Sequence, residues 1–351
     1  MPQEKEEGDM SDRTQNAAIG PAARGQEMSS RLDKKRLQLL FIDNIAWVLI
    51  IVFYAIFAIL RPEGMLKLST LSFMLYSSIP LGFIVVGVSL CQLLGAMDLS
   101  LAEMTGFIAM LSAMIITKWF PGINPVLAVF IPVILGLIGG GINGYMVGYV
   151  GLNPFLATLG AFMAYEGGTL LLHSYPIYSG FPSLYMSIGK DMSVAVPLFF
   201  AFILLVAFIL KYTPFGLHIY AVGGNRRSAA MLGLNPARTT FFTFSLAGGF
   251  AGLAALFYTG YLHSVPPSMA DGDIFMAFAG AIIGGIEQQG GRGSIINVLA
   301  GIIFLALVEA GLSMFNVNPY LRRVIFGLLV VVAIVINKTR NYFRDRILQT
   351  A

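Results

Sequence analysis

Long apolar runs dominate this 351-residue chain and constrain its fold more than any other feature. A helix needs about 20 apolar residues to cross a bilayer, where every backbone polar group must find its partner within the segment. Only 11% of the residues are charged, against roughly 25% in a soluble domain. The sequence therefore predicts an all-α polytopic membrane protein with about ten transmembrane helices, at residues 45–60, 71–94, 101–118, 125–148, 155–173, 193–211, 237–259, 274–288, 293–315 and 322–337.

Polar segments flank the apolar region and define the domains. Residues 1–44 are polar and mixed in charge, which predicts a disordered tail. The first apolar run starts too late for a cleaved signal peptide. Residues 45–338 form the transmembrane domain, and residues 339–351 form a C-terminal tail. The second run is long and the eighth is short, so breaks or re-entrant segments are expected there.

The distribution of Lys and Arg predicts the orientation. An even number of spans places both termini on one side, and basic residues accumulate on the cytoplasmic side. With the N-terminus inside, the inner segments hold sixteen Lys and Arg and the outer loops hold six. Without the long N-terminal tail the ratio is still nine to six. Both tails are therefore predicted to be cytoplasmic.

The chain lacks the motifs of common catalytic and cofactor sites. No G-x-x-x-x-G-K-[ST] sequence occurs, so the chain is not expected to bind ATP in a P-loop. Its histidines, His173, His218 and His263, have no metal-site spacing, and the single cysteine, Cys91, forms no disulfide within the chain. No catalytic, cofactor or metal residues are expected in this chain. A net charge of +4 gives no indication of nucleic-acid binding.

A short polar segment, "AVGGNRRSAAMLGLNPARTT" at residues 221–240, separates two apolar runs. Asn225 can cap a helix that runs to Leu232, Gly233 can end it in a left-handed conformation, and Asn235-Pro236 can start the next span. Two interpretations are open: the helix inserts into a groove on a partner, or it lies on anionic lipid. The residues concerned are Asn225, Arg226, Arg227, Ser228, Ala229, Ala230, Met231, Leu232 and Gly233.

Acidic residues within the apolar runs are candidates for function, because a carboxylate in a membrane is costly without a partner or a wet cavity. Asp98 lines a path or holds a break in the helix, and Ser100-x-x-Glu103 matches a capping box. Glu166 lies about twelve residues into the fifth span, roughly 18 Å along a helix and near the bilayer midplane. Glu166 bonds to a neighbouring span, packs in the interior as a protonated acid, or lines a path for solute. Glu309 is a weaker candidate for the path.

One glycine pattern predicts close helix packing, and one Asn-Pro pattern predicts where helices begin. Gly136, Gly140, Gly144 and Gly148 form one smooth stripe on a helix, which serves packing within the chain or a contact between subunits. Asn-Pro pairs begin at residues 124, 153, 235 and 318, where Asn suits the N-cap and Pro the first helical position.

Four segments together carry a family resemblance. They are Gly-x-x-Asp-Leu-Ser at 95–100, "FLATLG" at 155–160, "GGNRRSAAMLG" at 223–233 and "GGIEQQGGRGS" at 284–294. In order and spacing, residues 45–338 resemble the membrane permeases of bacterial ABC importers of the ribose, or simple-sugar, type.

The resemblance implies a dimeric inner-membrane permease, built from this chain twice or from this chain and a sister chain. It implies two cytoplasmic ATPase subunits that bind ATP and Mg, and a periplasmic solute-binding protein. Residues 225–232 then correspond to the coupling helix that docks on the ATPase. Thr158, in the "FLATLG" segment, joins the candidate path residues.

The chain departs from the family pattern at several positions. Arg226 and Arg227 stand where an acidic residue is common, and Glu166-Gly167 replaces Arg-Gly. Glu103 replaces a small residue, and Ile274-Phe275-Met276 stands in place of Glu-Leu-Asp. The predicted solute is therefore a sugar, a polyol or a related small polar compound, and ribose itself is not implied. The alternative is a secondary transporter driven by an ion gradient, for which Glu166 and Glu309 would suit ion coupling.

Overall fold

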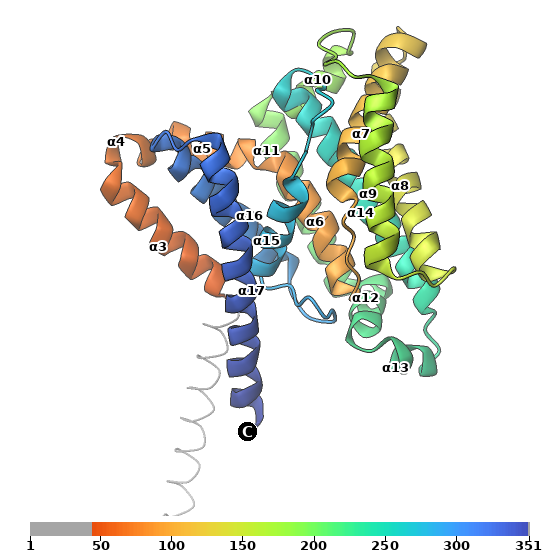
Figure 1. The fold of residues 1–351 in the computed structure, drawn as a ribbon, viewed down its shortest axis with the longest axis vertical. Coiled ribbons are helices and arrows are strands. Elements are labelled where there is room, and N and C mark those ends of the chain that lie inside the picture. The colour runs from red at the N-terminus through yellow and green to blue at the C-terminus, as the bar shows by residue number, and fades with distance from the viewer. Residues whose placement is uncertain (1–43, 350–351) are drawn as a thin grey trace, which may run out of the picture. The chain divides into compact units, whose positions relative to one another are not determined.

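The computed structural model describes residues 44–349, which are helical over most of their length. Residues 46–338 form one compact unit (Figure 1). The described helices are α3 (Ile45–Leu60), α4 (Pro62–Met65), α5 (Leu68–Ser77), α6 (Ile79–Leu93), α7 (Leu101–Met114, continued by a π-helical turn at Ile115–Trp119), α8 (Pro125–Gly148), α9 (Pro154–Leu172), α10 (Ser183–Lys190), α11 (Met192–Tyr212), α12 (Pro214–Gly224), α13 (Arg226–Met231), α14 (Pro236–Leu262), α15 (Asp273–Ile283), α16 (Ile295–Met314) and α17 (Pro319–Gln349).

The prediction of an all-α polytopic membrane protein is confirmed. Within residues 44–349, seven helices are long and apolar enough to cross a membrane, and the bent pair α5–α6 would add an eighth. Two further predicted spans coincide with the shorter apolar helices α3 and α15. The count of ten spans therefore stays a prediction. Apart from Asn44, the predicted disordered tail lies outside the described residues.

The second predicted span is broken, as its length suggested. Helices α5 and α6 meet at Ser78 with a bend of 47°. Pro80 lies in the first turn of α6 and has no N–H to continue the hydrogen-bond ladder of α5. The eighth predicted span is also short, because α15 covers only residues 273–283.

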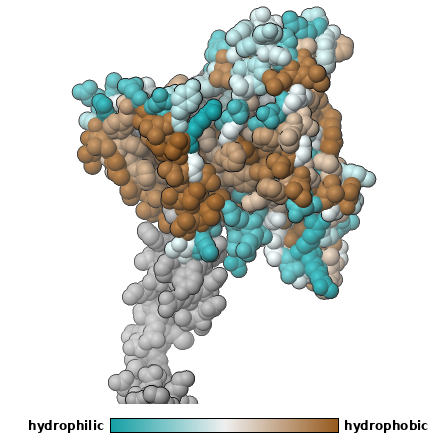
Figure 2. Space-filling model, in the orientation of Figure 1, coloured by the Kyte–Doolittle hydropathy of each residue, from teal (hydrophilic) through white to brown (hydrophobic). Residues whose placement is uncertain are grey.

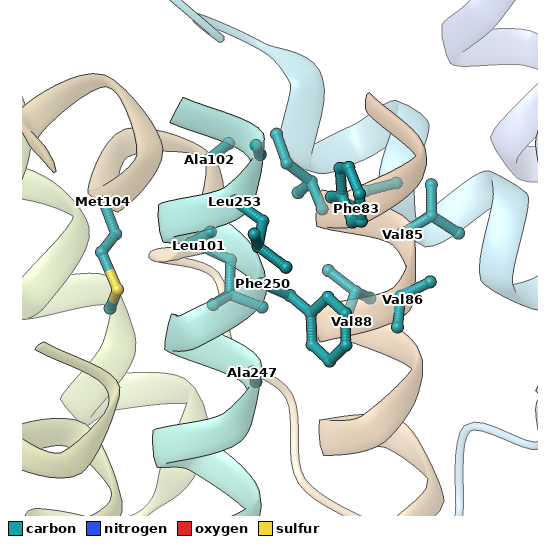
Figure 3. Packing of buried hydrophobic residues seen from close by; sticks show 14 of the residues in the cluster. Phe83, Val85, Val86, Val88, Leu101, Ala102, Met104, Ala247, Phe250 and Leu253 are labelled. Carbon is teal, nitrogen blue, oxygen red and sulfur yellow. The ribbon is translucent and has the colours of Figure 1, made fainter. Parts of the chain in front are cut away.

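Helix α14 lies at the centre of the unit. In its most apolar stretch of 18 residues 78% of the residues are buried, whereas in the corresponding stretch of α9 only 11% are buried. It packs against α6 and α8. Figure 3 shows apolar side chains of α6, α7 and α14 filling the space between these helices. Phe83 of α6 is fully buried, and its ring centroid lies 4.8 Å from that of Phe257 and 5.2 Å from that of Phe199.

The glycine stripe of α8 packs against α14 within the same chain, which decides between the two interpretations of the sequence. A Cβ placed on Gly136 would lie 2.1 Å from the carbonyl oxygen of Gly248. A Cβ on Gly140 would lie 2.1 Å from that of Phe244. The two helix backbones therefore touch without intervening side chains, as small residues permit in membrane proteins.

Apolar side chains also cover much of the outer surface. Figure 2 shows a hydrophobic band across the middle of the unit, with hydrophilic residues towards its two ends. Exposed large apolar residues are frequent on α8, α9, α11 and α17. Such a band suits contact with lipid chains or with another membrane subunit.

Candidate functional site

The short polar segment folds as the sequence predicted, with a helix bounded by a cap at each end. The side chain of Asn225 accepts a hydrogen bond from the backbone N–H of Ser228 at 2.9 Å, which is the N-cap interaction. Helix α13 ends before Gly233, whose φ of +84° is the left-handed conformation typical of a helix C-terminus. Asn235 then caps α14 by accepting from the N–H of Arg238 at 3.0 Å.

Helix α13 presents part of its apolar surface to the outside. Met231 is 75% exposed and Leu232 is 81% exposed. Ala230 is exposed as well, and so are the four polar residues before Ala229, which are Asn225, Arg226, Arg227 and Ser228. Ala229 differs, because it is only 3% exposed. It therefore packs inside the chain, and the exposed apolar residues of the segment around α13 are Ala230, Met231 and Leu232.

A groove lies beside α13, between α12 and α14. It measures about 460 Å³ and is lined by Phe215, His218, Leu234, Arg238 and Phe242, among others. Exposed apolar residues next to a hollow suit the docking of a folded partner.

Asp98 lies in the non-helical segment 94–100, between α6 and α7, and is fully buried. Its Oδ1 accepts the backbone N–H of Ser100 at 2.9 Å and the Ser100 hydroxyl at 2.6 Å. Asn143 of α8 donates to the Ser100 hydroxyl at 2.8 Å and to Asp98 Oδ2 at 3.4 Å. The carboxylate therefore holds the break between the two helices, which was one of the two roles left open.

The predicted capping box at Ser100-x-x-Glu103 is wrong. Ser100 has helical backbone angles, and its side chain makes no cap hydrogen bond to α7. The Ser100 hydroxyl is instead engaged by Asp98 and Asn143. Asn143 was not singled out from the sequence, although a lone amide within the glycine stripe of a span could have indicated a buried polar partner.

Thr158 holds the same segment from the other side. Its hydroxyl accepts the backbone N–H of Leu99 at 3.1 Å and donates to the carbonyl of Pro154 at 2.8 Å. Thr158 is fully buried, like Asp98. The structure thus brings Asp98 and Thr158 together, and in this conformation both act as anchors of segment 94–100.

Glu103 and Glu166 belong to a second region. Glu103 lies in the first turn of α7 and is 8% exposed. One turn further along α7, a Cβ on Gly106 would lie 2.7 Å from the carbonyl oxygen of Met269, so the segment between α14 and α15 packs closely there. Three other acidic side chains, those of Asp271, Glu166 and Asp273, are near enough to Glu103 for their negative charges to repel its own.

Glu166 itself is exposed on α9, the least buried of the candidate spans. A Cβ added to the adjacent Gly167 would meet no atom within 4 Å. An open surface with a carboxylate in the middle of a span is poorly suited to lipid alone.

Glu309 lies apart from the other candidates. It forms an ion pair with Arg322 at 2.9 Å, which is one of the structural roles expected of an intramembrane acid. It also lines a groove of about 550 Å³ together with Tyr261 and Ser313. Among the described residues, no group of three or more His, Cys, Asp or Glu side chains is placed to hold a metal ion.

Comparison with known proteins places this chain in a family. Residues 70–334 match the protein family described as "Branched-chain amino acid transport system / permease component". The D-allose transport system permease protein AlsC of Escherichia coli K12 is 32% identical over 290 residues, which cover 81% of this chain and 88% of AlsC. The ribose import permease protein RbsC of Bacillus subtilis 168 is 28% identical over 293 residues, 82% of this chain and 89% of RbsC.

A third relative covers more of the chain. The galactose/methyl galactoside import permease protein MglC of Haemophilus influenzae is 27% identical over 333 residues, 89% of this chain and 98% of MglC. No solved structure gives a significant match. The resemblance to ABC importer permeases is thus confirmed, and the comparisons favour it over an ion-driven secondary transporter. The chain is a multi-pass membrane protein that belongs to the branched-chain amino acid transport system / permease component family.

Proposed function

We propose that this chain is the permease subunit of an ATP-driven importer that brings a sugar, a polyol or a related small polar solute into the cytoplasm. The observation that carries the proposal is α13, a helix capped at both ends whose apolar tip, Met231 and Leu232, is exposed in the connection between α12 and the long apolar helix α14. Relatives named as permease proteins for the transport of ribose, allose and galactose support the solute class.

The proposal includes partners that the chain itself does not supply. Two cytoplasmic ATPase subunits bind ATP and Mg, and α13 docks in a groove on one of them. A periplasmic binding protein delivers the solute, and a second permease subunit, the same chain or a sister chain, completes the membrane unit. The complex resides in the bacterial inner membrane among lipids, with both termini of this chain in the cytoplasm. No nucleic-acid partner is proposed.

Transport follows an alternating-access cycle. ATP binding closes the ATPase subunits and moves α13, and the path between the two permease subunits then opens to the other side. The solute stabilises some of these states more than others and so shifts their populations. Glu166 suits the path because it is exposed on the open surface of α9. There its carboxylate can accept hydrogen bonds from solute hydroxyls.

The experiment uses the permease with its ATPase and its binding protein in sealed vesicles. Solute uptake should require ATP and should stop on addition of vanadate, whereas an ion-driven transporter would continue without nucleotide. Ala230→Glu should place an unpaired charge in the ATPase groove, at a cost of several kcal/mol. The ATPase should then fail to co-purify, although the permease still inserts.

Ala230→Ser is the matched control, because it changes the same exposed position without adding charge or much volume. It should retain both ATPase binding and uptake. Wild-type assembly and uptake in the Ala230→Glu variant would exclude α13 as the docking element.

A further inference from the structure

Three segments that are distant in the sequence meet at one point beside α13. They are the end of α6 with the turn at Gly95, the end of α12 at Gly223, and the loop of residues 284–294 after α15. Figure 1 shows this loop reaching from α15 towards α12. The N–H of Gly291 donates to the carbonyl of Leu93 at 2.8 Å, which links the loop directly to α6.

The contacts at this point are between backbones. A Cβ on Gly223 would lie 1.9 Å from the carbonyl oxygen of Leu93 and 2.7 Å from the nitrogen of Gly291. A Cβ on Gly290 would lie 2.6 Å from the Cα of Gly95. The three loop and turn glycines have φ values of +78° (Gly95), +89° (Gly290) and +74° (Gly291). We call Leu93, Gly95, Gly223, Gly290 and Gly291 the glycine junction.

Side-chain hydrogen bonds attach the loop to further helices. The Tyr220 hydroxyl of α12 donates to the carbonyl of Gly293 at 3.0 Å. Burial raises the pKa of this phenol, so it stays protonated and remains a donor. Asn337 of α17 donates to the carbonyls of Ile282 and Ile286 at 3.3 and 3.2 Å. The loop is thus held on two sides.

The position of the junction connects α13 to α6 and α15. Only Asn225 separates α12 from α13. A displacement of α13 therefore reaches Gly223 through less than one turn of chain. At the junction no side chain can absorb the movement by changing rotamer, and close-packed interiors transmit such strain. From there, α6 leads into the segment held by Asp98, and the loop leads back into α15.

We propose that the glycine junction is the positioning element that transmits movement of α13 to α6 and α15. This inference rests on the proposed function, because it requires that an ATPase moves α13. It gives a role to the glycine-rich loop 284–294, to which the sequence analysis assigned none beyond the family resemblance.

The test compares two adjacent glycines of α12. Gly223→Ala introduces a methyl group into the junction, whereas a Cβ on Gly224 would meet no atom within 4 Å. Alanine favours helices over glycine, so neither change weakens α12 through helix propensity. Each variant is purified with the ATPase, and three quantities are measured: ATPase co-purification, basal ATP hydrolysis, and solute imported per ATP hydrolysed in the presence of loaded binding protein.

Gly223→Ala should assemble and hydrolyse ATP at the basal rate, but its import per ATP should fall about tenfold, in the usual range of coupling between sites. Gly224→Ala should match the wild type in all three quantities. An assembled Gly223→Ala complex with wild-type import per ATP would overturn the inference. A merely structural role of Gly223 would reduce assembly or hydrolysis together with import.

A second variant applies if Gly223→Ala does not assemble. Tyr220→Phe removes only the hydrogen bond to Gly293 and should lower import per ATP by about fivefold at constant basal hydrolysis, the lower end of typical coupling. The control is Tyr178→Phe, at an exposed phenol. Unchanged import per ATP in Tyr220→Phe would overturn the inference. A wild-type chain that binds no ATPase would instead refute the proposed function, and the inference with it.

Discussion

Gly140→Ala tests the closeness of the α8–α14 contact. The added Cβ would lie 2.1 Å from the carbonyl oxygen of Phe244 and 2.9 Å from the Cα of Gly248. These neighbours are backbone atoms, so no rotamer change can relieve the clash. An ordinary van der Waals contact is at least 3.4 Å, so the two backbones would have to separate locally by the difference, about 1.3 Å.

Two effects of opposite sign decide how much Gly140→Ala changes the free energy of unfolding. Overpacking of a close-packed core costs about 1–3 kcal/mol, and a rigid backbone neighbour places this site at the upper end. Replacing a helical glycine by alanine returns up to about 1 kcal/mol through helix propensity. The net expectation is a loss of about 2 kcal/mol in the free energy of unfolding. This corresponds to a fall of several degrees in melting temperature.

The measurement is thermal unfolding of the purified permease in detergent, followed by the loss of the monodisperse species. Gly327→Ala is the control, because Gly327 is helical and a Cβ there would meet no atom within 4 Å. It keeps the propensity gain without the clash, so its melting temperature should stay the same or rise. The reasoning would be refuted by a Gly140→Ala protein that melts at or above the wild-type temperature.

Two further predictions concern intramembrane acids. Glu166→Gln should lower import with smaller effects on expression and basal ATP hydrolysis, and Glu166→Ala should lower it further; import at the normal rate in both variants would make Glu166 a structural residue. Asp98→Ala should lower the free energy of unfolding by about 2–4 kcal/mol, because buried donors of Ser100 and Asn143 lose their acceptor. Asp98→Asn keeps one acceptor oxygen and should cost less, and equal melting temperatures for wild type and Asp98→Ala would contradict this role.

Local sequence determined where many helices begin and end. At each of the four Asn-Pro pairs the asparagine side chain accepts a hydrogen bond from a backbone N–H in the first turn of the helix. The shortest of these bonds at each pair measures 2.8–3.0 Å. Gly233 has the expected left-handed conformation after α13. These interactions join residues within about four positions of each other, so the order of amino acids is enough to predict them. The long apolar runs predicted most of the candidate spans for the same reason, since hydropathy belongs to the segment itself.

Tertiary packing decided which residues face inwards and which segments meet. The periodic glycines of α8 showed that some backbone could approach, but only the fold identified α14 as its partner within the chain. Ala229 and Ala230 are neighbours of equal hydropathy, and contact with the rest of the unit buries the first and leaves the second exposed. Ser100 satisfied a local capping pattern, yet its hydroxyl bonds to Asp98 and Asn143 instead.

The glycine junction depends most on the fold. Leu93, Gly223 and Gly291 lie more than sixty residues from one another in the sequence. No local sequence pattern predicts that their backbones touch. Helix propensity and hydropathy act along a few turns of chain, whereas this contact exists only after α6, α12 and the loop following α15 have been brought to the same place by packing around α14.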